Sequence, residues 1–126
     1  MNLDRELDVA IRLAREAGRV LLDYYAFPTD VDYKAGQEPV TEADRAANAH
    51  IVAGIAEAFP EDGILAEETP DTRERLAHDR VWVVDPMDGT KEFIKHNGEF
   101  SVMIGLALDG AAELGVVYQP TEDRLF

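Results

Sequence analysis

Apolar residues at the start of the chain recur at steps of three and four, which is the spacing of a helix with one buried face. This pattern predicts a long amphipathic helix, whose apolar positions are Leu3, Leu7, Ala10, Ile11, Ala14, Ala17, Gly18, Leu21, Leu22 and Tyr25. Glycine destabilises a helix interior by roughly 1 kcal/mol relative to alanine. We therefore expect another part of the chain to pack closely against Gly18.

A second helix is predicted after a polar loop at 28–39. Thr41 and Asp44 resemble a capping box at its start, with aspartate where glutamate is usual. Pro60 marks its end. Its apolar stripe consists of Ala43, Ala47, Ile51, Ile55 and Phe59. His50 lies near this stripe, and we interpret it as a packed or edge histidine rather than a ligand.

Shorter apolar runs in the rest of the chain predict strands at 64–66, 81–84, 101–108 and 111–118, with the opening of a further strand at 124–126. The turn Asp109-Gly110 lies between two of these runs and is a strong signal for a hairpin. Residues 69–80 are predicted to form a loop, and 91–95 a single helical turn. Two helices followed by several strands indicate the α+β class.

Composition narrows the class of protein. The chain has 126 residues, of which 46% are hydrophobic, so it can bury the core of one globular domain. No apolar run approaches the ~20 residues that span a bilayer, and the N-terminus lacks a signal-peptide core. We therefore expect a cytoplasmic protein without a transmembrane segment. Because there is no cysteine, disulfides and thiolate metal sites are excluded.

The charge balance limits the partners of the chain. Twelve basic residues stand against 26 acidic ones, which gives a net charge of −14. This charge disfavours nucleic-acid polymers and anionic membranes as partners. A small phosphorylated molecule remains compatible with it, provided that cations neutralise the site.

The candidate chemistry lies where the apolar run 81–84 ends in two aspartates, Asp85 and Asp88. Two interpretations are equally supported by this segment alone. Asp85 and Asp88 are typical of an Asp-Pro turn in which carboxylates bond local backbone amides. Alternatively, both carboxylates and the intervening Met87 carbonyl face one hard divalent cation, which prefers oxygen ligands.

Two further groups favour the metal interpretation. Glu67 and Glu68 end another apolar run, and if the two strands are neighbours, the carboxylates meet and repel one another unless cations bind them. An oxygen-only ligand set suits Mg²⁺ rather than zinc or copper. The amides of Gly89 and Thr90 are predicted at a helix start that binds phosphate, although Thr90 is also interpretable as an N-cap. Metal-assisted cleavage of phosphate esters requires this combination.

These motifs resemble the inositol monophosphatase family of Mg²⁺-dependent, lithium-sensitive phosphatases. The segments that carry the resemblance are 39–44 (PVTEAD), 67–68 (EE) and 85–90 (DPMDGT). The segments that look most like the 3′(2′),5′-bisphosphate nucleotidase branch are 91–95, 97–102 and 114–120. The resemblance implies the N-terminal half of a layered α/β/α/β/α sugar-phosphatase fold, with two long helices on a largely antiparallel sheet. Residues 1–126 would form its metal-binding α+β portion, with the C-terminal half absent.

The resemblance also implies metal ligands. Glu67, Asp85 and the Met87 carbonyl would hold a first Mg²⁺, and Asp85 would bridge to a second ion that Asp88 also binds. Glu68 would hold a metal-bound water or a third, weaker ion, so the complete enzyme would use two or three Mg²⁺ ions. We refer to Glu67, Glu68, Asp85 and Asp88 as the carboxylate cluster.

Further roles follow from the same resemblance. Glu67, Thr90 and Asp44 would be the catalytic residues, with Thr90 bonded to Asp44 and orienting the attacking water. The amides of Gly89 and Thr90 would bind the substrate phosphate. Lys34 matches a family lysine near the active site, and it is equally well interpreted as a solvated loop residue.

One departure from the family pattern lowers the expected activity. The family takes another aspartate for the second metal from a Trp-Asp motif in the C-terminal half, whereas the only tryptophan here is Trp82. We therefore expect an N-terminal fragment that binds Mg²⁺ weakly and has little or no activity by itself.

The leading hypothesis is a Mg²⁺-dependent phosphomonoesterase in which metal-activated water removes the 3′(2′)-phosphate of adenosine 3′,5′-bisphosphate or a sulfated relative. Ser101 lacks a recognisable His or Lys partner, which supports direct attack by water. His78 and His96 are interpreted as surface residues. The alternatives are an inositol-1-monophosphatase or general sugar phosphatase, a non-catalytic metal- or phosphate-binding fragment, and an acidic α+β interaction domain. A homodimer is left open.

Overall fold

The computed structural model describes residues 2–25, 31–33, 39–66, 79–88 and 100–126. Its elements, in chain order, are α1 (Asp4–Tyr25), β1 (Val31–Tyr33), β2 (Pro39–Thr41), α2 (Glu42–Ala58), β3 (Gly63–Ala66), β4 (Arg80–Asp88), β5 (Ser101–Leu108), β6 (Ala111–Gln119) and β7 (Arg124–Leu125). Both predicted helices and every predicted strand are confirmed. Within these described ranges, no helix is long and apolar enough to cross a membrane.

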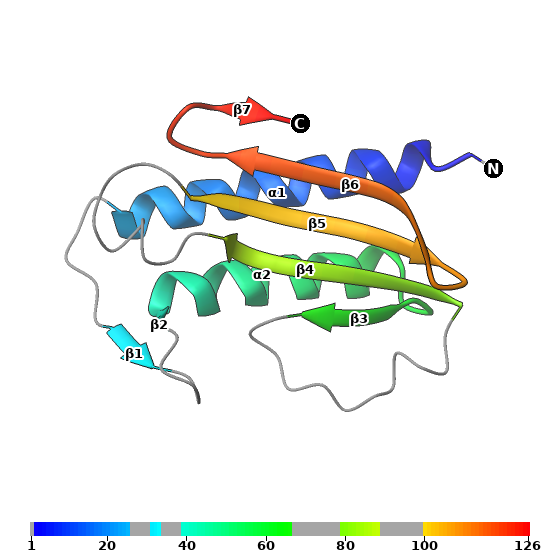
Figure 1. The fold of residues 1–126 in the computed structure, drawn as a ribbon, viewed down its shortest axis with the longest axis horizontal. Coiled ribbons are helices and arrows are strands. Elements are labelled where there is room, and N and C mark those ends of the chain that lie inside the picture. Colours follow the sequence, from blue (N-terminus) through cyan, green and yellow to red (C-terminus); the bar gives the residue numbers. More distant parts are fainter. Residues whose placement is uncertain (1, 26–30, 34–38, 67–78, 89–99) are drawn as a thin grey trace.

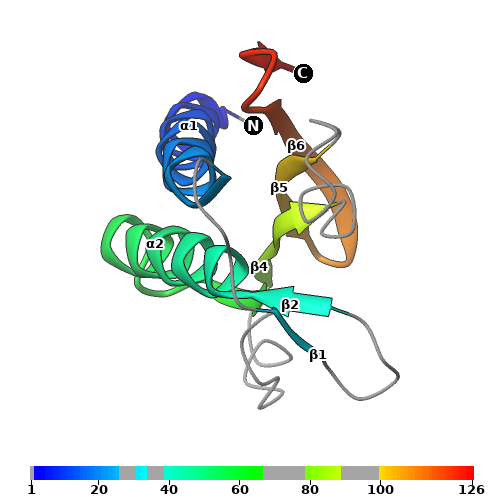
Figure 2. The same cartoon turned by 90° about the vertical axis from the view of Figure 1, so that its left-hand side faces the viewer.

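The larger sheet has five strands in the order β3-β4-β5-β6-β7. Only β3 and β4 run parallel, and the other neighbouring strands are antiparallel. The helices α1 and α2 lie side by side on one face of this sheet (Figures 1 and 2). The predicted arrangement of two long helices on a largely antiparallel sheet is therefore confirmed.

The core lies between the helices and the inner face of the sheet. Small residues on α1 and α2 let the two helices approach each other and the sheet closely, and the sheet contributes larger side chains. The fully buried side chains of greatest volume are Trp82, Phe100, Leu13, Leu21, Ile51, Ile55, Ile104, Leu106, Val84 and Val102. The expected close contact at Gly18 is present, since a Cβ there would lie 2.5 Å from the ring of Tyr118. Glycine at this position lets α1 pack directly against β6.

The hairpin between β5 and β6 forms as its turn sequence predicts. Asp109 and Gly110 have φ angles of 51° and 82°, both in the left-handed region. Two-residue hairpin turns of type I′ require this conformation at both positions, which explains the Asp-Gly pair.

The structure corrects the prediction of a loop at 28–39, because two short strands lie within or beside this segment. Val31–Tyr33 pairs antiparallel with Pro39–Thr41, with Val31 opposite Thr41. These strands have three residues each, which is too short for an alternating pattern to be recognised in the sequence. Pro39 lies at the first position of β2, where a missing N–H is tolerated.

An ionic network fixes the start of β4 to the helical layer. The Arg80 guanidinium donates through Nε to Asp62 Oδ1 at 3.0 Å and through Nη2 to Glu6 Oε2 at 2.8 Å. The indole Nε1 of Trp82 donates to Asp62 Oδ2 at 2.9 Å. Asp62 therefore accepts hydrogen bonds from two residues of β4 and fixes the position of this strand relative to α1 and the end of α2.

Replacing Asp62 tests this network. We expect Asp62→Ala to lower the free energy of unfolding by about 2–3 kcal/mol, because it removes a hydrogen-bond acceptor from both the half-buried Arg80 guanidinium and the indole N–H of Trp82. Glu42→Ala is the matched control, since it removes a carboxylate from the exposed pair with Arg45 and should change stability by less than about 1 kcal/mol. Urea unfolding measures both, and equal effects would contradict the network's role.

The same network predicts a pH dependence of stability. Burial alone would raise the pKa of Glu6, but the hydrogen bond and charge of Arg80 outweigh burial and lower that pKa below its ordinary value of 4.5. A carboxylate with a lowered folded-state pKa stabilises the protein above the unfolded pKa, and this stability is lost as the pH falls through the folded pKa. Melting temperatures measured from pH 6 down to about pH 3 should therefore fall less steeply for Glu6→Gln than for the wild type. An unchanged slope would contradict this assignment.

Candidate active site

The candidate site begins where two parallel strands end. Strand β3 pairs with β4 so that Ala66 lies opposite Val84. The next residue on β4 is Asp85, and Ala66 is followed in the sequence by Glu67 and Glu68. The carboxylate cluster required these strands to be neighbours, and that requirement is met. Glu67 and Glu68 themselves lie outside the described residues, so their part in the cluster stays a prediction.

The segment after Val84 differs from the predicted turn. Strand β4 continues through Pro86 to Asp88, and the register with β5 shifts between Asp85, opposite Met103, and Asp88, opposite Ser101. Two β4 residues therefore face one β5 residue, which is a β-bulge. Proline has no N–H for the ladder and is accepted in strands at such bulges.

The bulge changes which positions of β5 lie opposite the two aspartates. We call residues that lie opposite one another across neighbouring strands a row. In a regular strand, positions 85 and 88 would belong to opposite faces, because side chains alternate with a period of two. Here they pair with Met103 and Ser101, which are two residues apart and so belong to one face of β5. Because of the extra residue, the backbone of position 88 pairs with the same face of β5 as the backbone of position 85.

Asp85 makes one of the local contacts that the turn interpretation expected. Its Oδ1 accepts a hydrogen bond from the Met87 backbone N–H at 3.2 Å. Met87 is buried, whereas Asp85 is partly exposed. This contact orients the carboxylate without excluding a cation, because each carboxylate oxygen offers more than one lone pair. The aspartate and the Met87 carbonyl belong to the oxygen donor type that suits Mg²⁺.

Asp44, the catalytic aspartate that the resemblance implies, belongs to the helical layer. It lies in the first turn of α2 and is only 1% exposed. A carboxylate at a helix N-terminus is stabilised by the helix dipole, while full burial of a carboxylate is rare unless it is paired. Asp44 is therefore held at the end of α2 that follows β2. Its predicted partner Thr90 lies outside the described residues, and that hydrogen bond stays a prediction.

The remaining predicted site residues cannot be compared with the structure. Lys34, Gly89 and Thr90 lie outside the described residues, and only the backbone of Asp88 is described. Among the side chains that are described, no three histidines or carboxylates gather into a group that could hold a metal. The helical turn expected at 91–95, His78 and His96 also lie outside this part of the chain. His50, by contrast, is an edge histidine whose Nε2 lies 2.8 Å from Glu16 Oε1.

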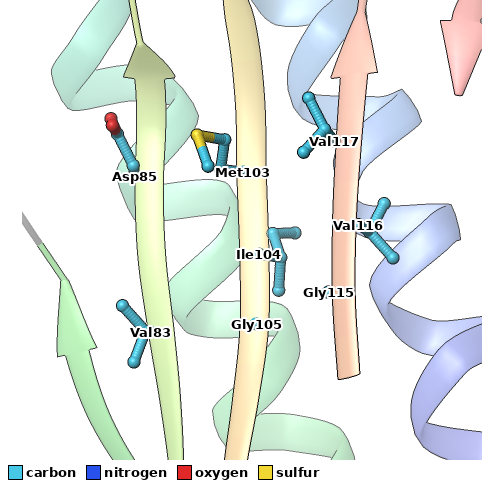
Figure 3. A pocket seen from close by; sticks show the side chains of 8 residues that line it. All are labelled: Val83, Asp85, Met103, Ile104, Gly105, Gly115, Val116 and Val117. Atoms are coloured by element: carbon cyan, nitrogen blue, oxygen red, sulfur yellow. The ribbon is translucent and has the colours of Figure 1, made fainter. Parts of the chain in front are cut away.

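Sequence reasoning missed the surface in which Asp85 lies. On the sheet face opposite the helices, Asp85 forms a row with Met103 and Val117, next to a row formed by Val83, Gly105 and Gly115 (Figure 3). Together with Ile104 and Val116, these residues line a hollow of about 240 Å³. The signal in the sequence was the continuous apolar run Val81–Val84 in β4 together with the apolar character of β5 after Ser101, since a solvated face would give alternating polar positions.

Comparison with known proteins identifies the family. The model of the inositol monophosphatase family matches residues 2–126. The chain belongs to the inositol monophosphatase family.

Relatives in this family agree with the nucleotidase branch and with the fold. The chain is 46% identical over 123 residues to the 3′(2′),5′-bisphosphate nucleotidase CysQ of Escherichia coli K12, covering 95% of this chain and 50% of that protein. Its structure is similar to CysQ from Bacteroides thetaiotaomicron, with 41% identity, a TM-score of 0.80, and 98% and 46% of the two chains covered. The suhB protein of Bartonella henselae gives a TM-score of 0.89 at 31% identity, covering 98% and 48%. The chain therefore spans about half the length of the inositol monophosphatase family members that it matches.

The Asp85–Met87 contact gives a test of the site's local structure. Asparagine retains an oxygen that accepts the Met87 amide, so Asp85→Asn should change the free energy of unfolding by less than about 0.5 kcal/mol when divalent cations are chelated. Asp85→Ala removes the acceptor and should cost about 1 kcal/mol. Urea unfolding of the chain measures both values. If the two variants were equally unstable, the hydrogen bond would not support the bulge.

Proposed function

We propose that this chain is the metal-binding half of a Mg²⁺-dependent phosphomonoesterase. The observation that carries the proposal is the parallel pairing of β3 with β4, with Ala66 opposite Val84. Parallel strands end at the same sheet edge, which supports convergence of Glu67 and Glu68 with Asp85 there. The bulge at Pro86 and Met87 supports a shared side for positions 85 and 88. Membership of the inositol monophosphatase family supports the same chemistry.

The donor set fits the cation. Glu67, Asp85, Asp88 and the Met87 carbonyl would hold two Mg²⁺ ions, with Glu68 beside them, and all of these donors are oxygen atoms. The chemistry that bound Mg²⁺ would supply is neutralisation of the clustered charge and a lowered pKa for a neighbouring water. The net charge of −14 makes such neutralisation necessary before a phosphorylated substrate can approach.

The chain's own residues would orient the reactants. Asp44, fixed and buried at the start of α2, would accept a hydrogen bond from the Thr90 hydroxyl, and Thr90 would in turn orient the attacking water. The amides of Gly89 and Thr90 would bind the phosphate oxygens at a helix start. Lys34 would add a positive charge at the rim. Binding of the Met87 amide to Asp85 Oδ1 would keep the carboxylate aimed while the substrate enters.

The proposed substrate is the 3′(2′)-phosphate of adenosine 3′,5′-bisphosphate or of its sulfated relative. The support is the 46% identity to a relative named 3′(2′),5′-bisphosphate nucleotidase. Because this chain spans half of that relative, the test uses a two-half protein: residues 1–126 followed by the half of the Escherichia coli K12 relative that the chain does not match.

The two-half protein should release phosphate from adenosine 3′,5′-bisphosphate in the presence of Mg²⁺ and lose this activity with a chelator. Asp85→Asn should lower kcat/KM at least about 100-fold, because loss of a ligand exceeds the roughly 10–100-fold effect of changing residues behind the ligands. Asp109→Asn makes the same chemical change in the hairpin turn, where asparagine is equally suited, and should leave activity unchanged.

Two outcomes of this assay would contradict the proposal. Full activity of Asp85→Asn would remove this carboxylate from the site. Faster hydrolysis of inositol 1-phosphate than of adenosine 3′,5′-bisphosphate would overturn the proposed substrate while leaving the phosphatase chemistry in place.

A further inference from the structure

The hydrophobic pattern of strand β3 does not select the register in which it pairs with β4. The strand has four residues, Gly63–Ala66, and within the described sheet β4 is its one neighbour (Figure 1). Ile64 and Leu65 belong to opposite faces because side chains alternate along a strand, yet both are apolar and both are partly buried. Register is strongly specified when one face alone is apolar, since a one-residue slip then exposes the apolar set. Strand β3 lacks this contrast between its faces.

Asp62, the residue immediately before β3, makes the contacts that do select a register. Its two carboxylate oxygens accept hydrogen bonds from Arg80 Nε at 3.0 and 3.1 Å, and one of them also accepts the Trp82 indole N–H at 2.9 Å. Because Gly63 pairs with Val81, Asp62 is level with Arg80 and reaches along β4 to Trp82. Two donors on β4, two positions apart, therefore hold the residue from which β3 starts.

Both donors are themselves held by the helical layer. The Trp82 side chain is fully buried, and its ring stacks on Phe59, after the end of α2, with 5.4 Å between the ring centroids. Arg80 also donates through Nη2 to Glu6 on α1 at 2.8 Å. Since neither donor can follow a sliding strand, both bonds of Asp62 form together in one register.

The register selected at Asp62 decides which residues meet at the other end of the two strands. In the observed register Ala66 lies opposite Val84, the residue before Asp85. A slip of two residues, the smallest that keeps each side chain on its own face, would move the end of β3 by about 7 Å relative to β4. Mg²⁺ requires near-ideal octahedral geometry with ligands about 2.0–2.1 Å away. A cation site shared by the two strand ends would not survive this displacement.

We propose that Asp62 is a positioning residue for the cation site, because it sets the register of β3 against β4 and so aligns the ends of both strands. Arg80, which is level with Asp62, lies five positions before Asp85, roughly 16 Å along a strand. Asp62 therefore acts through the strand pair and touches neither cation nor substrate. The inference rests on the proposed function, which supplies the cation site at these strand ends.

Mn²⁺ binding to the 126-residue chain tests this role, since Mn²⁺ replaces Mg²⁺ at oxygen ligands. Asp62→Ala should raise the dissociation constant about 10-fold or more, because the apparent affinity falls with the fraction of molecules in the binding-competent register. Asp62→Asn keeps an oxygen that accepts the Trp82 indole N–H and should recover most of the affinity. Paramagnetic broadening of the Ala66 and Asp85 amide signals gives the constants, so binding elsewhere on the acidic surface is not counted.

Two controls separate positioning from charge and from stability. Glu61→Ala removes the exposed carboxylate next to Asp62 and should leave the dissociation constant unchanged. Val116→Ala deletes buried methyl groups on β6, which borders neither β3 nor β4. It should lower the melting temperature without changing the affinity for Mn²⁺. All constants are measured at a temperature at which circular dichroism shows each variant to be folded.

NMR also measures the register itself. The wild type and both controls should give nuclear Overhauser effects between β3 and β4 that match the pairing of Ala66 with Val84. Asp62→Ala should weaken these effects, because part of the molecules then leave this register. The measurement is made without cations, so it does not depend on the proposed function.

The outcomes that overturn the proposal differ from those that contradict the proposed function. If the wild type binds Mn²⁺ at the strand ends and Asp62→Ala binds it equally well, the positioning role is wrong and the proposed function stands. Unchanged Overhauser effects in Asp62→Ala, or an equal loss of affinity in Val116→Ala, would also overturn the role. A wild type that does not bind Mn²⁺ at the strand ends would contradict the proposed function and the positioning role together.

Discussion

The parallel pairing of β3 with β4 is the constraint on which the candidate site depends. Every other pair of neighbours in the five-stranded sheet is antiparallel, and antiparallel neighbours end at opposite edges. Among the neighbouring strands of this described sheet, β3 and β4 alone have their carboxyl ends side by side at one edge, with Ala66 opposite Val84. The network of Arg80, Asp62 and Trp82 holds the other end of β4, so the position of Asp85 is set by contacts along the whole strand.

The bulge in β4 lies between Asp85 and Asp88, the two residues of this strand whose carboxylates are proposed as metal ligands. An Asp-Pro turn and a metal site were alternative interpretations of the sequence; the structure contains the local hydrogen bond that the turn interpretation expected, and the metal site stays a prediction. The strand continues to Asp88, and Asp85 accepts the Met87 amide as a turn residue would. The extra residue pairs the backbone of positions 85 and 88 with Met103 and Ser101, which are two residues apart on β5.

Local signals predicted most of the fold. The two helices follow from periodicity over several turns, the hairpin from Asp109-Gly110, and the contact with Tyr118 from a glycine where a helix would prefer alanine. The pair β1–β2 was missed because three-residue strands carry no periodic signal. Strand order and the ionic network could not be predicted, because they join residues distant in sequence, such as Glu6 and Arg80, 74 positions apart.

For the site, the motifs identified the family and supplied residues that stay a prediction, whereas the bulge and the apolar outer face required three-dimensional pairing. The central claim is that β3 and β4 end at one cation site. Mn²⁺ is a paramagnetic substitute for Mg²⁺ at oxygen ligands, and its effect on NMR spectra of the chain locates such a site. Small additions should first broaden the amide signals of Ala66, Asp85 and Met87. Uniform broadening over the acidic surface, with these three amides no more affected than those of α1, would contradict the account.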